Sequence, residues 1–264
     1  MKIGIVGCSG RMGQMLVSAI LGEPRATLSG GTERSGTASV GTDVGKPLGI
    51  TTTLNVSDNP GHLFAGSDAI IDFTSPAATR IHAELALSTK TALVVGTTGL
   101  SADDEALLKL VAQSVPVVYA PNYSVGVTLL SILVERAAAA LADDYDIEIV
   151  EMHHRHKVDA PSGTALGLGR AAAKGRAVAL DQVWRKTRDG HTGARPRGEI
   201  GFATLRGGDV VGDHSVIFAG DGERVELTHK ASNRSVFAAG AVRAALWTKG
   251  CAPGLYTMVD VLGV

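Results

Sequence analysis

The chain has 264 residues, of which 45% are hydrophobic and 19% charged, with 33 glycines. This composition excludes a disordered, collagen-like or coiled-coil protein and allows one large domain or two of ordinary size. The 25 lysines and arginines nearly balance the 26 aspartates and glutamates, so no overall field attracts nucleic acid or an acidic membrane surface.

Two cysteines, Cys8 and Cys251, are too few for a disulfide framework and lack the C-x-x-C spacing of a zinc or redox site. The apolar stretch at residues 3–8 is shorter than the apolar region of a signal peptide, and no run of about 18 apolar residues occurs. We therefore expect a cytoplasmic protein with no targeting or membrane-spanning segment.

Strands and helices are expected to alternate in the first half of the chain. The predicted strands are residues 2–6, 27–31, 68–73, 91–95 and 115–119, and the predicted helices are residues 12–21, 77–87 and 101–113, with a loop at 35–49. Gly22 closes the first helix, Pro76 starts the second, and Ser101 with Asp104 forms a capping box for the third. This alternation predicts a parallel sheet with helices on both faces.

The pattern changes after a long predicted helix at residues 127–141. A strand at 146–152, a polar loop at 153–162 and a helix at 163–174 precede β-prone segments at 201–205, 209–218 and 224–231, the last two joined by a hairpin around Asp221-Gly222. A final helix at 237–247 is expected to pack on the first domain. The fold class is thus α/β, a Rossmann-type doubly wound parallel sheet (residues 1–124 plus 236–264) with an inserted α+β domain on a mixed or antiparallel sheet (residues 125–235).

A glycine-rich turn follows the first predicted strand. Gly7-Cys8-Ser9-Gly10-Arg11-Met12-Gly13 has the spacing G-x-x-G-x-x-G, with Ser9 where G-x-G-x-x-G would have its second glycine. Glycine permits the tight turn, and the free N–H groups at the start of the helix bind a pyrophosphate. Arg11 adds a cation. The alternative is a packing turn between strand and helix.

An acidic residue lies where a dinucleotide site needs one. Glu33 stands 20 residues beyond Gly13 and can accept hydrogen bonds from a ribose, while Arg34 can pair with a 2′-phosphate. Either NADH or NADPH is therefore the expected cofactor, unless this is a solvated charge pair. Gly96-Thr97-Thr98-Gly99 and Ala120-Pro121-Asn122-Tyr123 end predicted parallel strands and are expected to face the nicotinamide half, although both could be plain loop ends.

The segment at residues 151–165, EMHHRHKVDAPSGTA, holds three of the eight histidines within four residues. A metal site is one reading, but Arg155 and Lys157 place fixed positive charge among the candidate ligands and no H-E-x-x-H pattern is present. A solvated basic loop is another. We favour a third, in which Ser162 caps the next helix and the N–H groups of Gly163 and Thr164 bind a carboxylate.

With Lys157 and His154 on the same loop, there are donors for two carboxylates, so a small dianion is the expected ligand. Histidine has an ordinary pKa near 6.5, and both His153 and Lys157 can exchange protons near neutral pH if their surroundings tune them. A cofactor in one domain and an acidic substrate in the other indicate hydride transfer.

Residues 151–165, the glycine turn, Gly96-Thr97-Thr98-Gly99, the segment 120–127, Arg206-Gly207-Gly208-Asp209 and residues 230–234 together resemble the dihydrodipicolinate reductase (4-hydroxy-tetrahydrodipicolinate reductase) family over essentially the whole chain. The resemblance implies a homotetrameric cytoplasmic enzyme of the diaminopimelate route to lysine. No metal is expected, because fixed positive charge lies among the candidate histidine ligands. It would reduce 4-hydroxy-tetrahydrodipicolinate, a cyclic imine dicarboxylate, to tetrahydrodipicolinate and water with NADH or NADPH.

By the same resemblance, His153 is the acid/base residue and Lys157 the proton donor. The expected substrate-binding residues are His154, Ser162, Gly163 and Thr164. The expected cofactor-binding residues are Gly7, Cys8, Ser9, Gly10, Arg11, Met12, Glu33, Arg34, Gly96, Thr97, Thr98, Ala120, Pro121, Asn122 and Tyr123. Hinge closure is expected at residues 124–126 and 232–234. A cofactor-sensing regulator and a dehydrogenase of another pathway are the competing functions.

Overall fold

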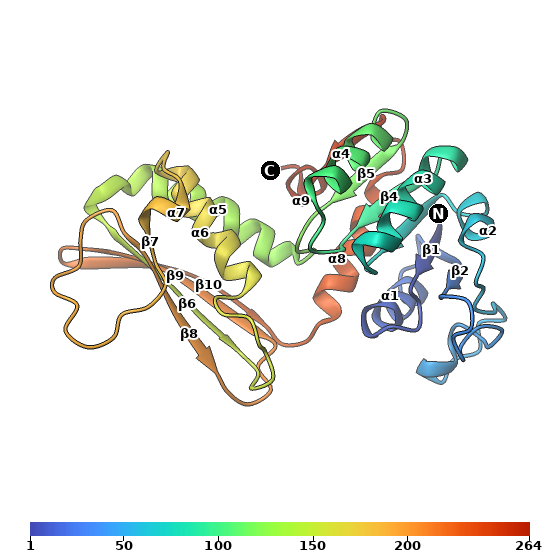
Figure 1. The fold of residues 1–264 in the computed structure, drawn as a ribbon, viewed down its shortest axis with the longest axis horizontal. Coiled ribbons are helices and arrows are strands. Elements are labelled where there is room, and N and C mark those ends of the chain that lie inside the picture. The colour runs from blue at the N-terminus through green and yellow to red at the C-terminus, as the bar shows by residue number, and fades with distance from the viewer. The chain divides into compact units, whose positions relative to one another are not determined.

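The computed structural model describes residues 1–264, which form two compact units (Figure 1). The first unit comprises Met1–Val125 together with Ser235–Val264, and the second comprises Gly126–Arg234. The second unit is therefore an insertion in the first, and the chain crosses between them twice.

The first unit is built on a six-stranded sheet in the order β11-β5-β4-β3-β1-β2, and all its strand pairs are parallel. Its strands are β1 (Lys2–Val6), β2 (Thr27–Thr32), β3 (Ala69–Asp72), β4 (Ala92–Val95), β5 (Pro116–Tyr119) and β11 (Gly254–Tyr256). The predicted doubly wound parallel sheet is confirmed. β11 was not predicted because it is only three residues long, and it pairs with β5 at the edge of the sheet.

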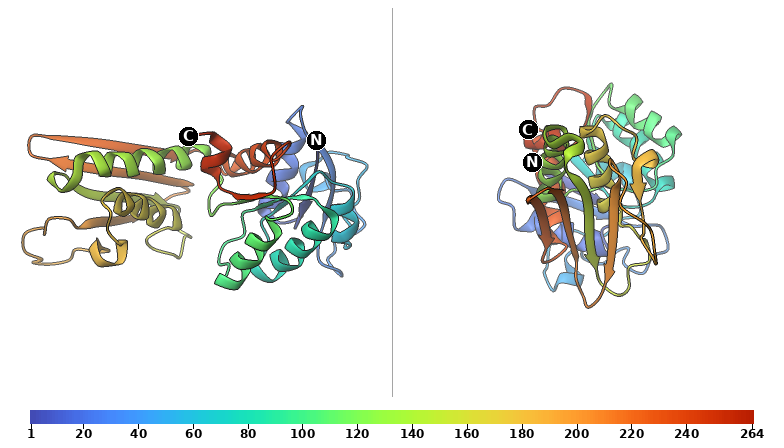
Figure 2. Two further views of the ribbon diagram at one scale, coloured as in Figure 1. Left: turned by 90° about the horizontal axis from the view of Figure 1, so that it is seen from above. Right: turned by 90° about the vertical axis from the view of Figure 1, so that its left-hand side faces the viewer.

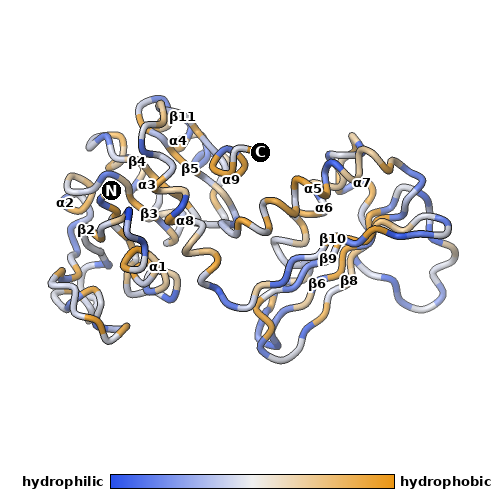
Figure 3. The backbone as a smooth tube through the Cα atoms, turned by 180° about the vertical axis from the view of Figure 1, so that it is seen from behind, coloured by the Kyte–Doolittle hydropathy of each residue, from blue (hydrophilic) through white to orange (hydrophobic).

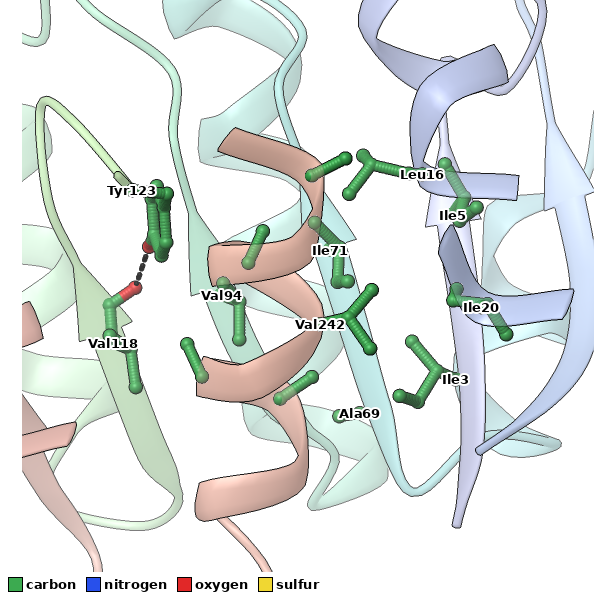
Figure 4. Close-up of a cluster of buried hydrophobic side chains, with 14 of the residues drawn as sticks. Ile3, Ile5, Leu16, Ile20, Ala69, Ile71, Val94, Val118, Tyr123 and Val242 are labelled. Atoms are coloured by element: carbon green, nitrogen blue, oxygen red, sulfur yellow. Dashed lines mark hydrogen bonds between the residues drawn. The ribbon is translucent and has the colours of Figure 1, made fainter. Parts of the chain in front are cut away.

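Helices cover both faces of this sheet. They are α1 (Arg11–Leu21), α2 (Pro60–Ala65), α3 (Pro76–Thr89), α4 (Ala102–Val111), α8 (Ser235–Trp247) and α9 (Met258–Leu262), with a short 3-10 turn at Lys46–Leu48. One core cluster joins α1, α8 and α9 to one face, where Ile3, Ile71 and Val242 meet (Figure 4). A second cluster joins α2, α3 and α4 to the other face. The strands are apolar on both sides because both sides are covered.

Local sequence signals account for several helix ends. The Ser101 side chain accepts a hydrogen bond from the Asp104 backbone, and the Asp104 carboxylate accepts one in return from the Ser101 backbone, so the predicted capping box is present. Proline occupies the first turn of α3, as expected. α2 was missed in the sequence, although Asn59 caps it and Pro60 starts it.

The second unit is built on a five-stranded sheet in the order β10-β9-β6-β8-β7. Its strands are β6 (Asp146–His153), β7 (Trp184–Arg185), β8 (Ile200–Arg206), β9 (Gly212–Gly220) and β10 (Glu223–Ala231). β10, β9 and β6 are antiparallel neighbours, whereas β6, β8 and β7 are parallel, so the sheet is mixed and the purely antiparallel version of the prediction is wrong. The hairpin at Asp221-Gly222 joins β9 to β10, as predicted. The loop from β7 to β8 is hydrophilic over most of its length (Figure 3).

Two helices, α5 (Val125–Leu141) and α6 (Gly163–Gly175), lie on one face of this sheet (Figure 2), followed by the short α7 (Leu180–Val183). Together with a 3-10 turn at Ala142–Asp144, α5 is long and apolar enough to cross a membrane by length and composition. Of the apolar 18-residue stretch within it, 28% is buried inside the protein. One such helix is weak evidence for a membrane span. Leu130, Val134 and Ala138 of α5 belong to the core of the second unit.

Candidate functional site

The glycine turn of the first unit depends on the absence of side chains at two positions. Gly7 has a φ of +71°, a conformation that glycine adopts without strain. A Cβ added at Gly13 would lie 2.2 Å from the Gly7 carbonyl oxygen, so only glycine lets α1 approach the turn this closely. The turn after β1 is thus held by close contact between main-chain atoms.

A cavity of about 540 Å³ opens beside this turn. Gly7, Gly10, Glu33 and Arg34 line it, so the structure brings four of the sequence-predicted cofactor residues together. The Glu33 carboxylate accepts a hydrogen bond of 2.9 Å from the backbone N–H of Ser9. The cavity lies where β1 is flanked by β2 on one side and β3 on the other, which is the switch point at which open α/β sheets bind ligands.

Other predicted cofactor residues have side chains that face elsewhere. Cys8 is buried, and burial raises the pKa of its thiol to about 11. Arg11 lines a separate cavity of about 610 Å³ between α1 and α8. The Tyr123 hydroxyl is buried and donates to the carbonyl oxygens of Val95 and Val118, each at 2.9 Å. Cys8 and Tyr123 therefore offer a ligand only their main-chain atoms.

The segments that end β4 and β5 are also built around buried contacts. A Cβ added at Gly96 would lie 2.2 Å from the Phe73 ring, so glycine makes room for this aromatic side chain. The Thr97 hydroxyl accepts hydrogen bonds from the backbone of Thr74 and from the Thr79 hydroxyl. Thr98 and Pro121 are exposed, Asn122 is half-buried and Ala120 is buried.

An aspartate–histidine pair in this unit was missed in the sequence. Asp72, fully buried at the end of β3, accepts hydrogen bonds from His82 Nδ1 at 2.8 Å and from the backbone and hydroxyl of Thr74. Burial alone would raise the pKa of the Asp72 carboxyl, but these hydrogen bonds outweigh it and lower the pKa. His82 lines the cavity, and only its position on the helix after β3 could have indicated this.

In the second unit, the inward face of β6 changes from apolar to ionisable along the strand. Every second residue of the strand is buried on this face, and these are Ile147, Ile149, Glu151 and His153. His214 of β9 lies directly opposite Glu151 and is also buried. The core of the unit therefore continues at one end of the sheet into a cluster of buried ionisable side chains.

Glu151 lies at the centre of this cluster. Its carboxylate accepts hydrogen bonds from His153 Nδ1 at 2.5 Å, from the Ser162 backbone N–H at 3.0 Å, and from Arg206 Nη1 and Nη2 at 2.8 and 2.9 Å. Burial would raise the pKa of Glu151, but the hydrogen bonds from Arg206, His153 and Ser162 lower it. Glu151 is therefore a buried anion, and each of its two oxygens accepts two hydrogen bonds.

The basic loop after β6 is held by charges on both sides. Lys157 Nζ lies 2.8 Å from the carboxylate of Asp159, and Arg206 Nη2 donates to the Asp159 carbonyl oxygen at 2.7 Å. His154 Nε2 lies 3.2 Å from Arg234 Nη2 and, because arginine only donates, accepts this bond. Burial and the neighbouring Arg234 lower the pKa of His154. Because Nε2 accepts a hydrogen bond, the neutral ring carries its proton on Nδ1, a buried atom with no partner in the protein.

Ser162 caps α6, as predicted. Its hydroxyl oxygen accepts a hydrogen bond from the Ala165 backbone at 3.1 Å and lies 3.1 Å from His214 Nε2. Burial and the nearby His153 lower the pKa of His214 to about 4, so the ring that shares this hydrogen bond with the Ser162 hydroxyl is neutral. A Cβ added at Gly163 would meet nothing within 4 Å, which leaves the start of the helix accessible.

The three histidines of the basic loop do not converge on one point. His153 contacts Glu151, His154 contacts Arg234, and no group of three or more His, Cys, Asp or Glu side chains is placed to hold a metal ion. Instead the segment offers ammonium, imidazole and main-chain N–H donors together with a histidine paired to a carboxylate. Such a set can bind an anion and exchange protons with it.

Comparison with known proteins identifies the family. Residues 1–123 match the model of "Dihydrodipicolinate reductase, N-terminus" and residues 126–262 match "Dihydrodipicolinate reductase, C-terminus". The 4-hydroxy-tetrahydrodipicolinate reductase of Dinoroseobacter shibae is 54% identical, covering 99% of this chain and 98% of that protein. The corresponding enzyme of Brucella abortus is 53% identical, covering 100% of this chain and 99% of that protein.

A solved structure of dipicolinate-bound dihydrodipicolinate reductase from Paenisporosarcina sp. TG-14 has the same fold, with a TM-score of 0.76 at 23% identity and 98% coverage of both chains. The sequence relatives carry the assignment, and the solved structure supports the fold. The chain therefore belongs to the dihydrodipicolinate reductase family and is an oxidoreductase that uses NADH or NADPH.

Proposed function

We propose that this enzyme reduces 4-hydroxy-tetrahydrodipicolinate to tetrahydrodipicolinate and water, with the cofactor held by the first unit and the substrate by the second. The observation that carries the assignment is the set of groups on residues 151–165, in which a carboxylate-paired histidine precedes a lysine and the capped start of a helix. The relatives named for this reaction, and the neighbour solved with dipicolinate, support a cyclic dicarboxylate as the ligand.

The first unit fits a dinucleotide. The main chain of Gly7–Met12 would hold the pyrophosphate, Glu33 the ribose, and Arg34 a 2′-phosphate where one is present. The main chain of Gly96–Thr98 and of Ala120–Tyr123 would hold the nicotinamide half. The main-chain role of Cys8 and Tyr123 in this assignment agrees with their buried side chains.

In the second unit, each substrate carboxylate has its own donors. The N–H groups of Gly163 and Thr164, at the start of the helix that Ser162 caps, would hold one carboxylate. His154, whose buried Nδ1 has no partner in the protein, would donate to the other, together with Lys157. Two anchored carboxylates fix the orientation of the ring.

The reaction needs one proton from the protein. Loss of the C4 hydroxyl together with a proton of the neighbouring ring carbon, as water, leaves a carbon–carbon double bond conjugated to the imine. A nicotinamide held by the main chain of residues 96–98 and 120–123 would supply the hydride that adds at C4. The enamine so formed takes a proton at the neighbouring carbon from Lys157 or His153. Positive charge around the ring also stabilises the anion that develops there.

Hydride transfer requires contact between the two ligands at about 3 to 3.5 Å. The chain crosses between the units near residues 124–126 and 232–234, and we assign hinge closure to these two segments. Small-angle scattering with and without both ligands tests the assignment, because closure would change the scattering profile, whereas identical profiles would contradict it. We also assign the enzyme to the cytoplasm, as a homotetramer assembled through the second unit.

The deciding experiment follows loss of NADPH absorbance on adding the freshly made cyclic imine. We expect H153Q and K157A to lower kcat by a factor on the order of 10² to 10⁴, while the Kd for NADPH stays near that of the wild type. Near-normal kcat in both variants would overturn the roles of His153 and Lys157. A protein that binds NADPH without turnover would be a regulator, and turnover with other carbonyl acids would indicate another dehydrogenase.

A further inference from the structure

The ion pair between buried Glu151 and half-buried Arg206 serves no step in the reaction proposed above, yet it contacts both segments that carry that reaction. Glu151 accepts a hydrogen bond from His153, and Arg206 donates one to the carbonyl oxygen of Asp159 in the basic loop. Asp159 in turn pairs with Lys157 at 2.8 Å. A continuous chain of charge-assisted contacts therefore runs from His153 to Lys157.

We propose that Glu151 and Arg206 are positioning residues, which together fix the ring of His153 and hold the loop that carries Lys157. The inference rests on the proposed roles of His153 and Lys157. Neither positioning residue is assigned a contact with substrate or cofactor.

The geometry of Glu151 supports the first half of the proposal. Its side chain is 1% exposed, and each of its two oxygens accepts two hydrogen bonds, so it has no freedom to turn. An ionised carboxylate only accepts, and therefore the Nδ1 atom of His153 must carry a proton. The other ring nitrogen, Nε2, is then left to exchange a proton on the side away from Glu151.

The geometry of Arg206 supports the second half. Its two terminal nitrogens form a bidentate pair with Glu151, and Nη2 also reaches the Asp159 carbonyl oxygen. Lysine has a single terminal nitrogen and cannot make the paired contact. The guanidinium also compensates the charge of Glu151, which would otherwise be an unpaired anion in the core. Arg206 thus links the strand that carries His153 to the loop that carries Lys157.

The first test is the protonated nitrogen of neutral His153, read by solid-state ¹⁵N NMR of histidine-labelled protein and assigned by comparison with H153Q. We expect the wild type to carry the proton on Nδ1. In E151Q the amide can present N–H to the ring, and we expect the proton on Nε2. A wild-type ring protonated on Nε2 would overturn the proposal even if E151Q failed to fold.

The second test is kinetic. We expect E151Q to lower kcat by a factor on the order of 10², because a wrong tautomer of a catalytic histidine is costly even in intact geometry. The Kd for NADPH should be unchanged, because that site lies in the first unit. E148Q is the matched control: Glu148 lies on the same strand and pairs with Arg188 and Arg195, but not with His153. It should leave both the tautomer and kcat unchanged within about twofold.

Arg206 is tested separately. We expect R206M to lower kcat by at least tenfold with His153 still protonated on Nδ1. R206K should have a kcat between those of R206M and the wild type. In the double variant E151Q/R206M, kcat should fall by less than the product of the two single effects. Wild-type kcat in both E151Q and R206M would overturn the positioning roles. If H153Q and K157A were themselves fully active, the proposed catalytic roles would fail, whereas the tautomer measurement would still judge the Glu151–His153 contact.

Discussion

In the first unit, the segments assigned to the cofactor rely mostly on main-chain atoms, whereas in the second unit the segment assigned to the substrate adds several ionisable side chains to the main-chain N–H groups at the start of α6. In these segments, Cys8 of the glycine turn and Tyr123 after β5 direct their side chains into the core. Around the basic loop, Glu151 and Arg206 place theirs among the functional groups. The first site should therefore be damaged mostly by added atoms, and the second mostly by removed groups.

Within the glycine turn, the largest effect of an added atom is expected at Gly13. In G13A the new Cβ would lie 2.2 Å from the Gly7 carbonyl oxygen and 2.7 Å from two main-chain carbons of Cys8, none of which can move without opening the turn. We expect a loss of about 3 kcal/mol or more in the free energy of unfolding, together with a large loss of NADPH affinity. Urea unfolding and a fluorescence titration with NADPH measure the two effects.

The matched control is G167A in α6. A Cβ there meets nothing within 4 Å, and alanine favours a helix interior, so this variant should gain up to about 1 kcal/mol. Equal stability of G13A and wild type would contradict the main-chain account of the first site.

Much of this contrast could be predicted from the sequence. The strand and helix alternation, the glycine turn and the Ser101 capping box follow from local patterns, and the structure confirms them. Glu33 was expected from its spacing alone, and it does reach the turn, through the Ser9 backbone. Signals of this kind depend on backbone conformation, which neighbouring residues largely determine.

The parts that were missed depend on pairing between distant segments. Glu151 has a local signal, because it shares the inward phase of β6 with Ile147 and Ile149, where an ionisable residue needs a partner. Its partner Arg206 is 55 residues away, and nothing in the sequence set the register that brings them together. The parallel pairing of β6 with β8 was missed for the same reason.

The next effect concerns the buried polar cluster of the second unit. The pKa of His214 is lowered from 6.5 to about 4, chiefly by burial and then by the charge of His153. Between pH 6.5 and 4, His214 therefore binds a proton in the unfolded chain but not in the folded chain. The contribution of neutral His214 to the free energy of unfolding is fully present above pH 6.5 and is lost as the pH is lowered. Over this window the loss is about 3 kcal/mol.

H214Q removes this titration, so its free energy of unfolding should vary less with pH than that of the wild type. Trp184 lies in the second unit and Trp247 in the first, so urea unfolding followed by fluorescence in a W247F background reports the second unit. His154 and His229 also have lowered pKa values and contribute to the slope in both proteins. Identical slopes with and without His214 would contradict its neutral buried state.

The first site has one side chain whose removal should matter to a single cofactor. Arg34 lines the cavity next to Glu33, and we assign it to the 2′-phosphate. R34A should weaken NADPH binding about tenfold and leave NADH binding nearly unchanged, since only NADPH carries this phosphate. R25A removes an arginine that pairs with Glu23 outside this cavity, and should change neither Kd. An unchanged preference for NADPH in R34A would remove the assignment.

The smallest effect is the sharpest test of the contrast, because it removes a functional group from a segment assigned to the cofactor. In Y123F the carbonyl oxygens of Val95 and Val118 each lose a buried hydrogen bond, which should cost about 1 to 2 kcal/mol of stability. The Kd for NADPH should stay within about twofold, because only the main chain of residue 123 is available to a ligand.

Y256F is the matched control, since it removes a tyrosine hydroxyl that donates to the Ala252 carbonyl at the surface, and it should cost less than about 0.5 kcal/mol. Unfolding and NADPH titration of both variants give the comparison. A Y123F protein of unchanged stability that had lost NADPH affinity would mean that this side chain turns out of the core to meet the cofactor. The division between a main-chain site and a side-chain site would then fail at this residue.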